Sequence, residues 1–251
     1  SASFSLSIQG QAISFQLEPT KGRKLSLRPA LTGDFFRILC PSKRMESHIP
    51  DFLAANEAWI LEQYARLQQR EQKREKWKHG VLTGQFGFMG IAHQLYFEPA
   101  HRATVTYEEE KQRFRIQIPA SRQTDAATRS FLAYQALQKV IHRALVRKTQ
   151  ELAKETGDQF QTVRTKNQLT KWGSCSSRRA INLNAHLAFL PDSVRDYIII
   201  HELMHLREMN HSARFWNLVA QYCPNYQQEV KQLTHYDWLI GTLNGWEAEF
   251  K

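Results

Sequence analysis

The chain has few of the features that mark exported, disulfide-bonded or membrane proteins. Its three cysteines, Cys40, Cys175 and Cys223, are far apart and form no CxxC pair, so the sequence favours a reducing compartment over a disulfide framework. It has no run of about eighteen apolar residues, and the opening SASFSLSIQG has no basic region leading into an apolar one. These absences predict a soluble, cytoplasmic protein that is not exported and has no membrane partner.

Internal repeats and low-complexity segments are not apparent either, so the organisation must be read from local patterns. The 251 residues are 42% hydrophobic, which is enough for one large domain or two small ones. Short apolar clusters between turn signals predict strands, and a 3.6-residue apolar period predicts helices after Ser47 and after Asp125. The predicted strands are AISFQL (12–17), KLSLRP (24–29), FFRILC (35–40), HQLYFEP (93–99), ATVTYEEE (103–110) and QRFRIQIP (112–119).

The change from strands to helix suggests two parts. We predict an α+β protein with a β-rich N-terminal subdomain and one long helix over residues 1–120. A second domain follows over residues 121–251, and the SRQTDAAT stretch (121–128) is the best candidate boundary between them.

The net charge of +10 is unevenly distributed. Residues 61–80 carry six Lys/Arg against three acids, and residues 142–180 carry nine against three, so these segments hold most of the excess. A polyanion such as nucleic acid is one partner that this charge permits. Charges of both signs alternate at helical spacing in QQREQKREKWKH, however, and no nucleic-acid motif accompanies them, which favours solvated helix faces.

The chemistry concentrates in DSVRDYIIIHELMHL (192–206), an apolar helix pattern that contains two histidines and an acid. His201 and His205 are four residues apart, so both point to the same side of a helix and can share one metal ion. Glu202 lies beside them, where its carboxylate can reach a metal-bound water without occupying a coordination position. Neutral imidazoles suit Zn²⁺. The HELMH stretch therefore predicts a hydrolytic zinc site.

The third ligand requires the helix to stop. On a continuous helix His211 would lie roughly 9 Å beyond His205 along the axis, too far to share the ion. We expect Asn210 to end the helix in the left-handed conformation and Ser212 to cap a new one, so that His211 turns back to the metal. The HExxHxxxxxH spacing equals that of metzincins, although Glu208 replaces their glycine and no Met-turn is present. Glu229 and His235, on the next helix, are the alternative third ligands.

The segment 165–226 resembles a known family. Its motifs WGSCS, INLN, HELMHL and NHSARFW closely resemble those of the YgjP-like metallopeptidases, relatives of the SprT-like and WLM zinc peptidases, and KLSLRP and FLAANEAWI (52–60) extend a weaker resemblance towards the N-terminus. The resemblance implies a zincin-like catalytic core behind a β-rich N-terminal part. It also implies zinc held by His201, His205 and His211, with Glu202 as the catalytic acid/base.

This interpretation predicts amide hydrolysis of a peptide or protein substrate, in which Glu202 takes the proton of a zinc-activated water and returns it to the leaving amine. We expect WGSC (172–175) to form a tight turn that leads to the strand INLN (181–184). This strand, with Trp172 and Asn184, is expected near the zinc, where zincin peptidases bind extended substrates. Cys175 is either an inhibitory fourth ligand or, more simply, a buried hydrophobe. The candidates for oxyanion stabilisation are Tyr236, His235, Tyr226 and His186.

Two alternatives belong to other classes of function. One is a DNA-associated zinc protein, such as a protease that acts on DNA-bound proteins, as SprT-like relatives do, with the basic 142–180 region as its DNA contact. The other is a non-catalytic, zinc-stabilised interaction domain, against which Glu202 argues, because a purely structural site has no use for a base beside its ligands.

Overall fold

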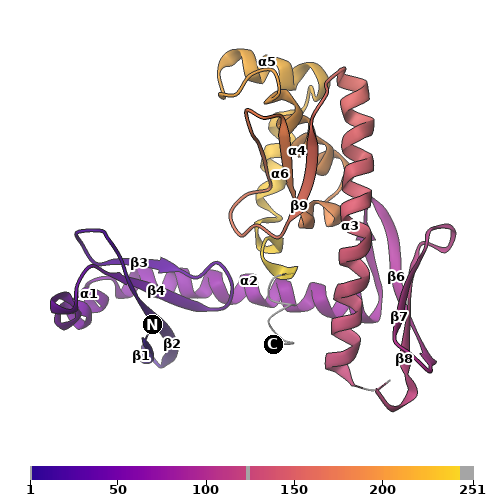
Figure 1. The fold of residues 1–251 in the computed structure, drawn as a ribbon. Coiled ribbons are helices and arrows are strands. Elements are labelled where there is room, and N and C mark those ends of the chain that lie inside the picture. Colours follow the sequence, from indigo (N-terminus) through magenta and orange to yellow (C-terminus); the bar gives the residue numbers. More distant parts are fainter. Residues whose placement is uncertain (1, 123–124, 244–251) are drawn as a thin grey trace. The chain divides into compact units, whose positions relative to one another are not determined.

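The computed structural model describes residues 2–122 and 125–243 (Figure 1). Contacts divide the chain into two units, Ser1–Lys76 and Trp77–Lys251. This boundary lies earlier than the sequence pattern places it. The physical reason is that apolar side chains of the strands between residues 85 and 119, such as Phe86 and Phe114, are buried in the same core as Leu137 and Leu145 of the following helix.

The N-terminal unit is a four-stranded sheet with helices after it. Its strand order is β1-β2-β4-β3, and the predicted strands near residues 12–17, 24–29 and 35–40 are confirmed. The core joins the sheet to the long helix α2 through Phe15, Phe36, Ile60 and Tyr64. The elements are β1 (Ala2–Ile8), β2 (Gln11–Pro19), β3 (Ser26–Pro29), β4 (Phe35–Cys40), the 3₁₀ segment Lys43–His48, α1 (Ile49–Ala55) and α2 (Glu57–Thr83).

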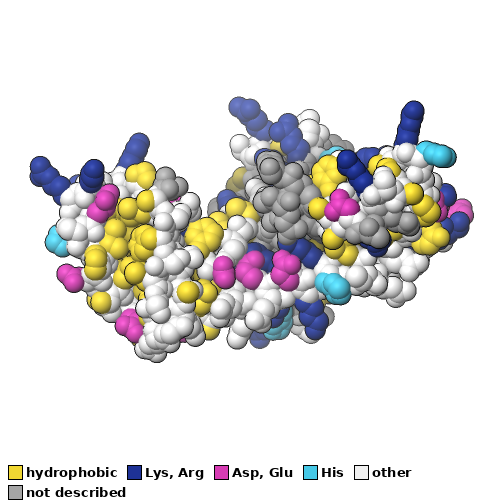
Figure 2. Space-filling view, turned by 90° about the horizontal axis from the view of Figure 1, so that it is seen from below, with side chains coloured by type: hydrophobic (Ala, Val, Ile, Leu, Met, Phe, Trp, Pro, Cys, Tyr) yellow, Lys and Arg dark blue, Asp and Glu magenta, His cyan; other side chains and the backbone are white. Residues whose placement is uncertain are grey.

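The helix predicted after Ser47 is interrupted at Asn56. This residue leaves the helical conformation (φ −112°, ψ 13°), and its side-chain amide donates to the carbonyl of Phe52. On the face shown in Figure 2, hydrophobic side chains gather over the N-terminal unit. Leu6 on the edge strand β1 and Trp59 on α2 are among its exposed large hydrophobic residues.

The second unit contains a four-stranded sheet followed by a 31-residue helix. The sheet has the order β5-β6-β8-β7. The helix, α3 (Ala126–Thr156), begins at the predicted position, because the side chain of Asp125 accepts from the amide of Ala127. The strands are β5 (Gln85–Phe88), β6 (Ile91–Ala100), β7 (Thr104–Glu108) and β8 (Arg113–Pro119), with 3₁₀ segments at Glu109–Lys111 and Ala120–Arg122.

A small three-stranded sheet and three short helices complete this unit. The sheet has the order β10-β11-β9, so β10 is an edge strand. The INLN stretch is the predicted strand, whereas the WGSC stretch, predicted as a turn, forms β10. The elements are β9 (Thr162–Lys166), β10 (Gly173–Cys175), β11 (Ala180–Asn184), the 3₁₀ segment Ala185–Phe189, α4 (Asp192–Met204), α5 (Ala213–Tyr222), α6 (Tyr226–Thr234) and the 3₁₀ segment Asp237–Leu239.

The architecture is α+β, as predicted, with helices and small mixed sheets in both units. Among the described helices, none has the length and apolar character needed to cross a membrane.

The turn between β5 and β6 rests on the start of α4. The amide of Met89 donates to the carbonyl of Ala188 over 2.7 Å. Gly90 has a positive φ of 77°, and a Cβ atom there would overlap the carboxylate of Asp192, the first residue of α4. A residue with a side chain at this position would have to displace that carboxylate and adopt the positive φ, so glycine is favoured here.

The two four-stranded sheets repeat one another, which the sequence did not reveal. In each, the first two strands form an antiparallel hairpin, the second strand pairs in parallel with the fourth, and the third pairs antiparallel with the fourth. Each hairpin turns through two residues with positive φ, Gln9–Gly10 and Met89–Gly90. A long helix follows each sheet. The protein therefore contains two copies of one β-sheet and helix unit.

The pairing registers align the two copies residue by residue. Phe15 pairs with Phe36 in the first copy and Leu95 with Phe114 in the second. In this alignment Glu18 and Arg37 form an ion pair, and so do Glu98 and Arg115 at the corresponding positions. The matching stretches are IQGQAISFQLEP (8–19) with FMGIAHQLYFEP (88–99), and FRILCPSKR (36–44) with FRIQIPASR (114–122).

Candidate metal centre

Helix α4 carries the HELMH stretch inside the second unit. Nine of its residues are buried, among them Ile199, Glu202 and Leu203. A helix so enclosed holds its polar side chains in fixed positions, because neighbouring atoms occupy the space around them. His201 and Glu202 lie in its last turn, and His205 is the residue at its C-terminal end.

The helix stops, as the third-ligand prediction requires, but not at Asn210. Helix α4 ends at Met204, and the amide of Leu206 already bonds to Leu203 in the tighter 3₁₀ manner. Asn210 does not adopt the left-handed conformation. Its side-chain oxygen instead accepts from the amide of Ser212. A short polar side chain that bonds to the backbone two residues later stabilises a turn without positive φ. The Asn210 prediction is therefore wrong in its mechanism.

Ser212 begins the next helix as predicted. Its hydroxyl accepts from the amide of Phe215 at the start of α5. The end of α4 is also fixed from outside, because the guanidinium of Arg207 pairs with Asp158 at 2.7 Å and bonds to the carbonyl of Thr156. These contacts set the path of the chain between His205 and His211.

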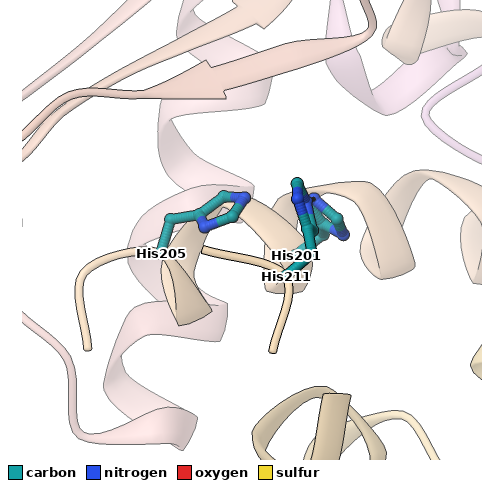
Figure 3. A group of neighbouring side chains, drawn as sticks. All are labelled: His201, His205 and His211. Carbon is teal, nitrogen blue, oxygen red and sulfur yellow. Dashed lines mark hydrogen bonds between the residues drawn. The ribbon is translucent and has the colours of Figure 1, made fainter. Parts of the chain in front are cut away.

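The reversal brings three imidazoles together (Figure 3). The candidate ligand atoms of His201, His205 and His211 all lie within 4.8 Å of one another. The Nε2 atoms of His201 and His211 are 3.1 Å apart. Ligand nitrogens at 2.0–2.1 Å from a tetrahedral ion stand about 3.3 Å from each other, so small rotations of the rings bring this group to that geometry.

The alternative ligands lie elsewhere. Among the described residues, neither Glu229 nor His235 nor Cys175 belongs to the group of three histidines. Glu229 is buried and accepts from the hydroxyl of Ser193 at the start of α4. Burial and the nearby Glu202 raise the pKa of the Cys175 thiol to about 11, so the thiol is protonated near neutral pH in the metal-free site.

The electrostatics of the site favour neutral imidazoles. Burial, followed by the neighbouring His205 and His211, lowers the pKa of His201 to about 3, and burial also lowers the pKa of His205. A neutral ring offers a lone pair to a metal. The Nδ1 atom of His205 lies 3.0 Å from the carbonyl oxygen of Glu208, so Nδ1 carries the proton and Nε2 remains free as a donor to a metal.

Two aromatic residues that sequence reasoning missed support the three histidines. The ring of Phe215, fully buried, lies 4.8 Å from that of His201, 4.4 Å from that of His205 and 4.9 Å from that of His211. Trp216 stacks on His211 from one side and on Tyr226 from the other. The signal in the sequence was the position of both aromatics in the first turn and a half after the Ser212 cap, four and five residues after the third histidine.

Glu202 lies against Gly173 of strand β10, which has no side chain. A Cβ atom on Gly173 of β10 would be 2.6 Å from its Oε1 atom. Burial raises the pKa of Glu202 to about 8, a rise that the charge of Lys171 reduces. Its Oε2 atom, like the Nδ1 atom of His201, is buried and has no hydrogen-bond partner among the described residues.

The comparison with family models identifies the chain. The model of the YgjP-like metallopeptidase domain matches residues 23–236, most of the sequence. The chain belongs to the YgjP-like metallopeptidase family. Neither the search of curated proteins nor that of solved structures found a match. Membership of this family implies a metal ion, and the three histidines provide a group that can hold one.

In this YgjP-like domain, Asn184 orders the loop before β10. Its side-chain amide donates to the carbonyls of Gln168 and Lys171, and its oxygen lies 2.6 Å from Nδ1 of His186. Because Asn184 bonds to this loop and to His186, it positions the backbone beside Glu202. The expectation that Asn184 lies close to the three histidines stays a prediction.

Of the candidates for oxyanion stabilisation, His186 has both ring nitrogens occupied by hydrogen bonds. His186 is fully buried, and its Nε2 atom accepts from the amide of Leu243. Both ring nitrogens are therefore engaged within the fold. Tyr226, through Trp216, is linked by ring stacking to His211.

The donor set of the YgjP-like site fits a metal ion such as Zn²⁺. It offers three imidazoles, two of which, His201 and His205, have a pKa lowered by burial, and the ring of His205 is oriented by a backbone carbonyl. The residue after His201, Glu202, adds a buried unpartnered carboxylate oxygen. Three nitrogen ligands leave a fourth position open, as catalytic zinc sites require.

Proposed function

We propose that this protein is a zinc-dependent peptidase that uses His201, His205 and His211 as ligands and Glu202 as general base and acid. The supporting observation is the group of three imidazoles, whose candidate ligand atoms lie within 4.8 Å of one another, together with the buried Glu202, which follows the first of them in α4 and has one unpartnered carboxylate oxygen. An ion held there would supply a Lewis acid and lower the pKa of a water towards about 7.

The residues of the chain account for the remaining chemistry. Glu202 accepts the proton of the attacking water and then donates it to the amine that leaves, so one carboxyl group serves both steps. Burial raises the pKa of Glu202 to about 8 in the metal-free site. The positive charge of a bound ion would lower this pKa and so favour the carboxylate form that accepts the proton. Phe215 and the Glu208 carbonyl hold the imidazoles in place.

Strand β10 is suited to bind the substrate. It is the edge strand of its sheet, and its first residue, Gly173, is in contact distance of Glu202. An extended peptide that pairs with an edge strand gains backbone hydrogen bonds and presents its carbonyl groups at regular intervals. A peptide bound to β10 would lie alongside the proposed base.

The test combines metal content with activity. We expect about one zinc ion per chain in the wild type and in Glu202→Gln, less zinc in His211→Ala, and cleavage of a peptide library by the wild type alone. Turnover by Glu202→Gln at the wild-type rate would contradict the role of Glu202. Full zinc content in His211→Ala would contradict the ligand set.

Binding to nucleic acid is a second candidate. Four exposed cations on or near the small sheet have no carboxylate partner among the described residues: Arg164, Lys166, Lys171 and Arg178. By contrast, Arg66, Arg70 and Arg74 in the 61–80 segment pair with acids on their own helix. Salt-dependent DNA binding that falls in a quadruple Glu variant of the unpaired cations would support this candidate, and no binding at low salt would contradict it.

A further inference from the structure

The second unit contains a cavity that the proposed peptidase chemistry does not use. Its volume is about 680 Å³, within the range of small-molecule sites. It lies between α3 and the β5–β8 sheet, which run beside each other in Figure 1. Its apolar lining consists of Phe88, Met89, Ile91, Val105, Val140 and Ala144.

One wall of the cavity is basic. Lys139, Arg143 and Arg147 line it from successive turns of α3. Arg147 pairs with Glu109 at 3.3 Å, whereas Lys139 and Arg143 are exposed and have no carboxylate partner within residues 2–122 and 125–243. A cavity with an apolar interior and two unpaired cations at its edge is complementary to a molecule with an apolar body and an anionic group.

The floor holds a polar pair, the buried His93 and the half-buried Tyr107. The Nδ1 atom of His93 lies 3.0 Å from the carbonyl oxygen of Ile91, so Nδ1 carries the ring proton, and Nε2 accepts from the hydroxyl of Tyr107 at 3.0 Å. His93 is 3% exposed. Burying such a pair costs free energy that a purely apolar floor would avoid.

The first copy of the repeat shows that the fold does not require this pair. The strand registers align His93 with Ile13 and Tyr107 with Pro29. Ile13 is fully buried in the corresponding place. The same sheet and helix therefore form with an apolar pair, and the polar floor is specific to the copy that holds the cavity.

At the edge of the cavity, the second copy has apolar residues where the first copy has polar ones. Met89 and Ile91 align with Gln9 and Gln11 at the equivalent hairpin turn. Ile91 is 48% exposed, so this copy places apolar side chains in water where the other uses amides. Exposed apolar residues around a concave site are typical of ligand binding.

From these observations we propose that the cavity binds a small amphipathic carboxylate, whose apolar chain contacts Met89, Ile91 and Val140 and whose anionic group pairs with Lys139 and Arg143. None of the three histidines lines the cavity, so this proposal and the proposed peptidase function are tested separately.

The experiment measures binding of octanoate, decanoate, decanol and decylamine to the full chain by calorimetry. We expect decanoate to bind about fifteenfold more tightly than octanoate, because each of the two added methylenes contributes about 0.8 kcal/mol, or about fourfold in affinity. Decanol and decylamine should bind at least tenfold more weakly than decanoate. Equal binding of the three ten-carbon probes would overturn the proposal.

Variants assign the binding to this cavity. Met89→Gln/Ile91→Gln installs the residues of the first copy, which are compatible with the hairpin, and should weaken decanoate binding at least tenfold, as should Lys139→Glu/Arg143→Glu. The matched controls are Gln9→Met/Gln11→Ile in the first copy and Lys154→Glu on α3 outside the cavity, which should bind as the wild type does. Unchanged binding in both cavity variants, with cooperative unfolding retained, would contradict the proposal.

Discussion

At the scale of single residues, the metal-free protein keeps a carboxyl group in a place that disfavours its charge. Burial raises the pKa of Glu202 from 4.5, the ordinary value of a glutamic acid, to about 8. Below pH 4.5 the carboxyl is protonated in both the folded and the unfolded state, and stability is unaffected. As pH rises from 4.5 to about 8 the unfolded state loses its proton first, so the free energy of unfolding falls over this window.

The first prediction follows from this fall in the free energy of unfolding with rising pH. Glu202→Gln should stabilise the metal-free protein, by an amount that grows from pH 5 to pH 8 and reaches on the order of a few kcal/mol, because each pKa unit corresponds to about 1.4 kcal/mol. Thermal unfolding in the presence of a chelator measures the effect. Stabilisation that shrinks as pH rises would contradict the prediction.

Gly173 gives a second prediction at the same scale. A methyl group there would be 2.6 Å from the Glu202 Oε1 atom, so Gly173→Ala must displace the carboxylate or the strand, at a cost of roughly 1–3 kcal/mol. We expect zinc content to be retained and peptidase activity to fall at least tenfold. Gly87→Ala is a matched control, because a Cβ there meets no atom within 4 Å. Equal activities of the two variants would show that the contact is unimportant.

At the scale of secondary-structure elements, α5 functions as the support of the histidine group. Phe215 contacts all three imidazole rings. Phe215→Leu should therefore lower zinc affinity about tenfold or more, since residues that orient metal ligands typically contribute this much. Competition with a chromophoric chelator measures the affinity. Val219→Ala, at another fully buried position of α5, should lower stability while leaving the affinity within about threefold of wild type.

Sequence reasoning reached some of these elements and missed others for identifiable reasons. The spacing of His201 and His205 is local, so helical periodicity suffices to place both rings on one side. The start of α3 at Asp125 and of α5 at Ser212 was also predictable, because a cap depends on neighbouring residues. The end of α4 was not, since the contacts of Arg207 with residues 156 and 158 are distant in sequence.

The repeat was missed for a related reason. The two copies share only short runs of identical residues, such as Glu-Pro in β2 and β6 and Phe-Arg-Ile in β4 and β8. The pairing of the strands and its register show that these runs are equivalent. Strand β10 was mistaken for a turn because three residues with a glycine carry no alternation. It forms because β11 offers it a partner. Long-range pairing of this kind leaves little trace in a single sequence.

At the scale of the whole molecule, the boundary inside α2 makes a prediction about fragments. Val81 is fully buried in the core of the second unit, and the ring of Trp77 packs on Phe189 at 4.9 Å. A fragment of residues 57–251 should therefore unfold cooperatively. A fragment of residues 121–251, the extent of the domain predicted from sequence, should not, because the sheet that buries Leu137 and Leu145 is missing. Cooperative melting of the shorter fragment, followed by circular dichroism, would support the boundary near residue 121.

The turn at Met89–Gly90 has a consequence for how the second unit opens. Its backbone bonds to Ala188, and Gly90 lies directly against Asp192 at the start of the helix that carries the histidines. The hairpin tip cannot separate from that helix without breaking this contact, so the two should belong to one cooperative opening unit. In native-state hydrogen exchange we expect the amide of Met89 to show the same opening free energy as amides in the middle of α4. Faster exchange at Met89 would mean that the tip frays while the helix stays closed.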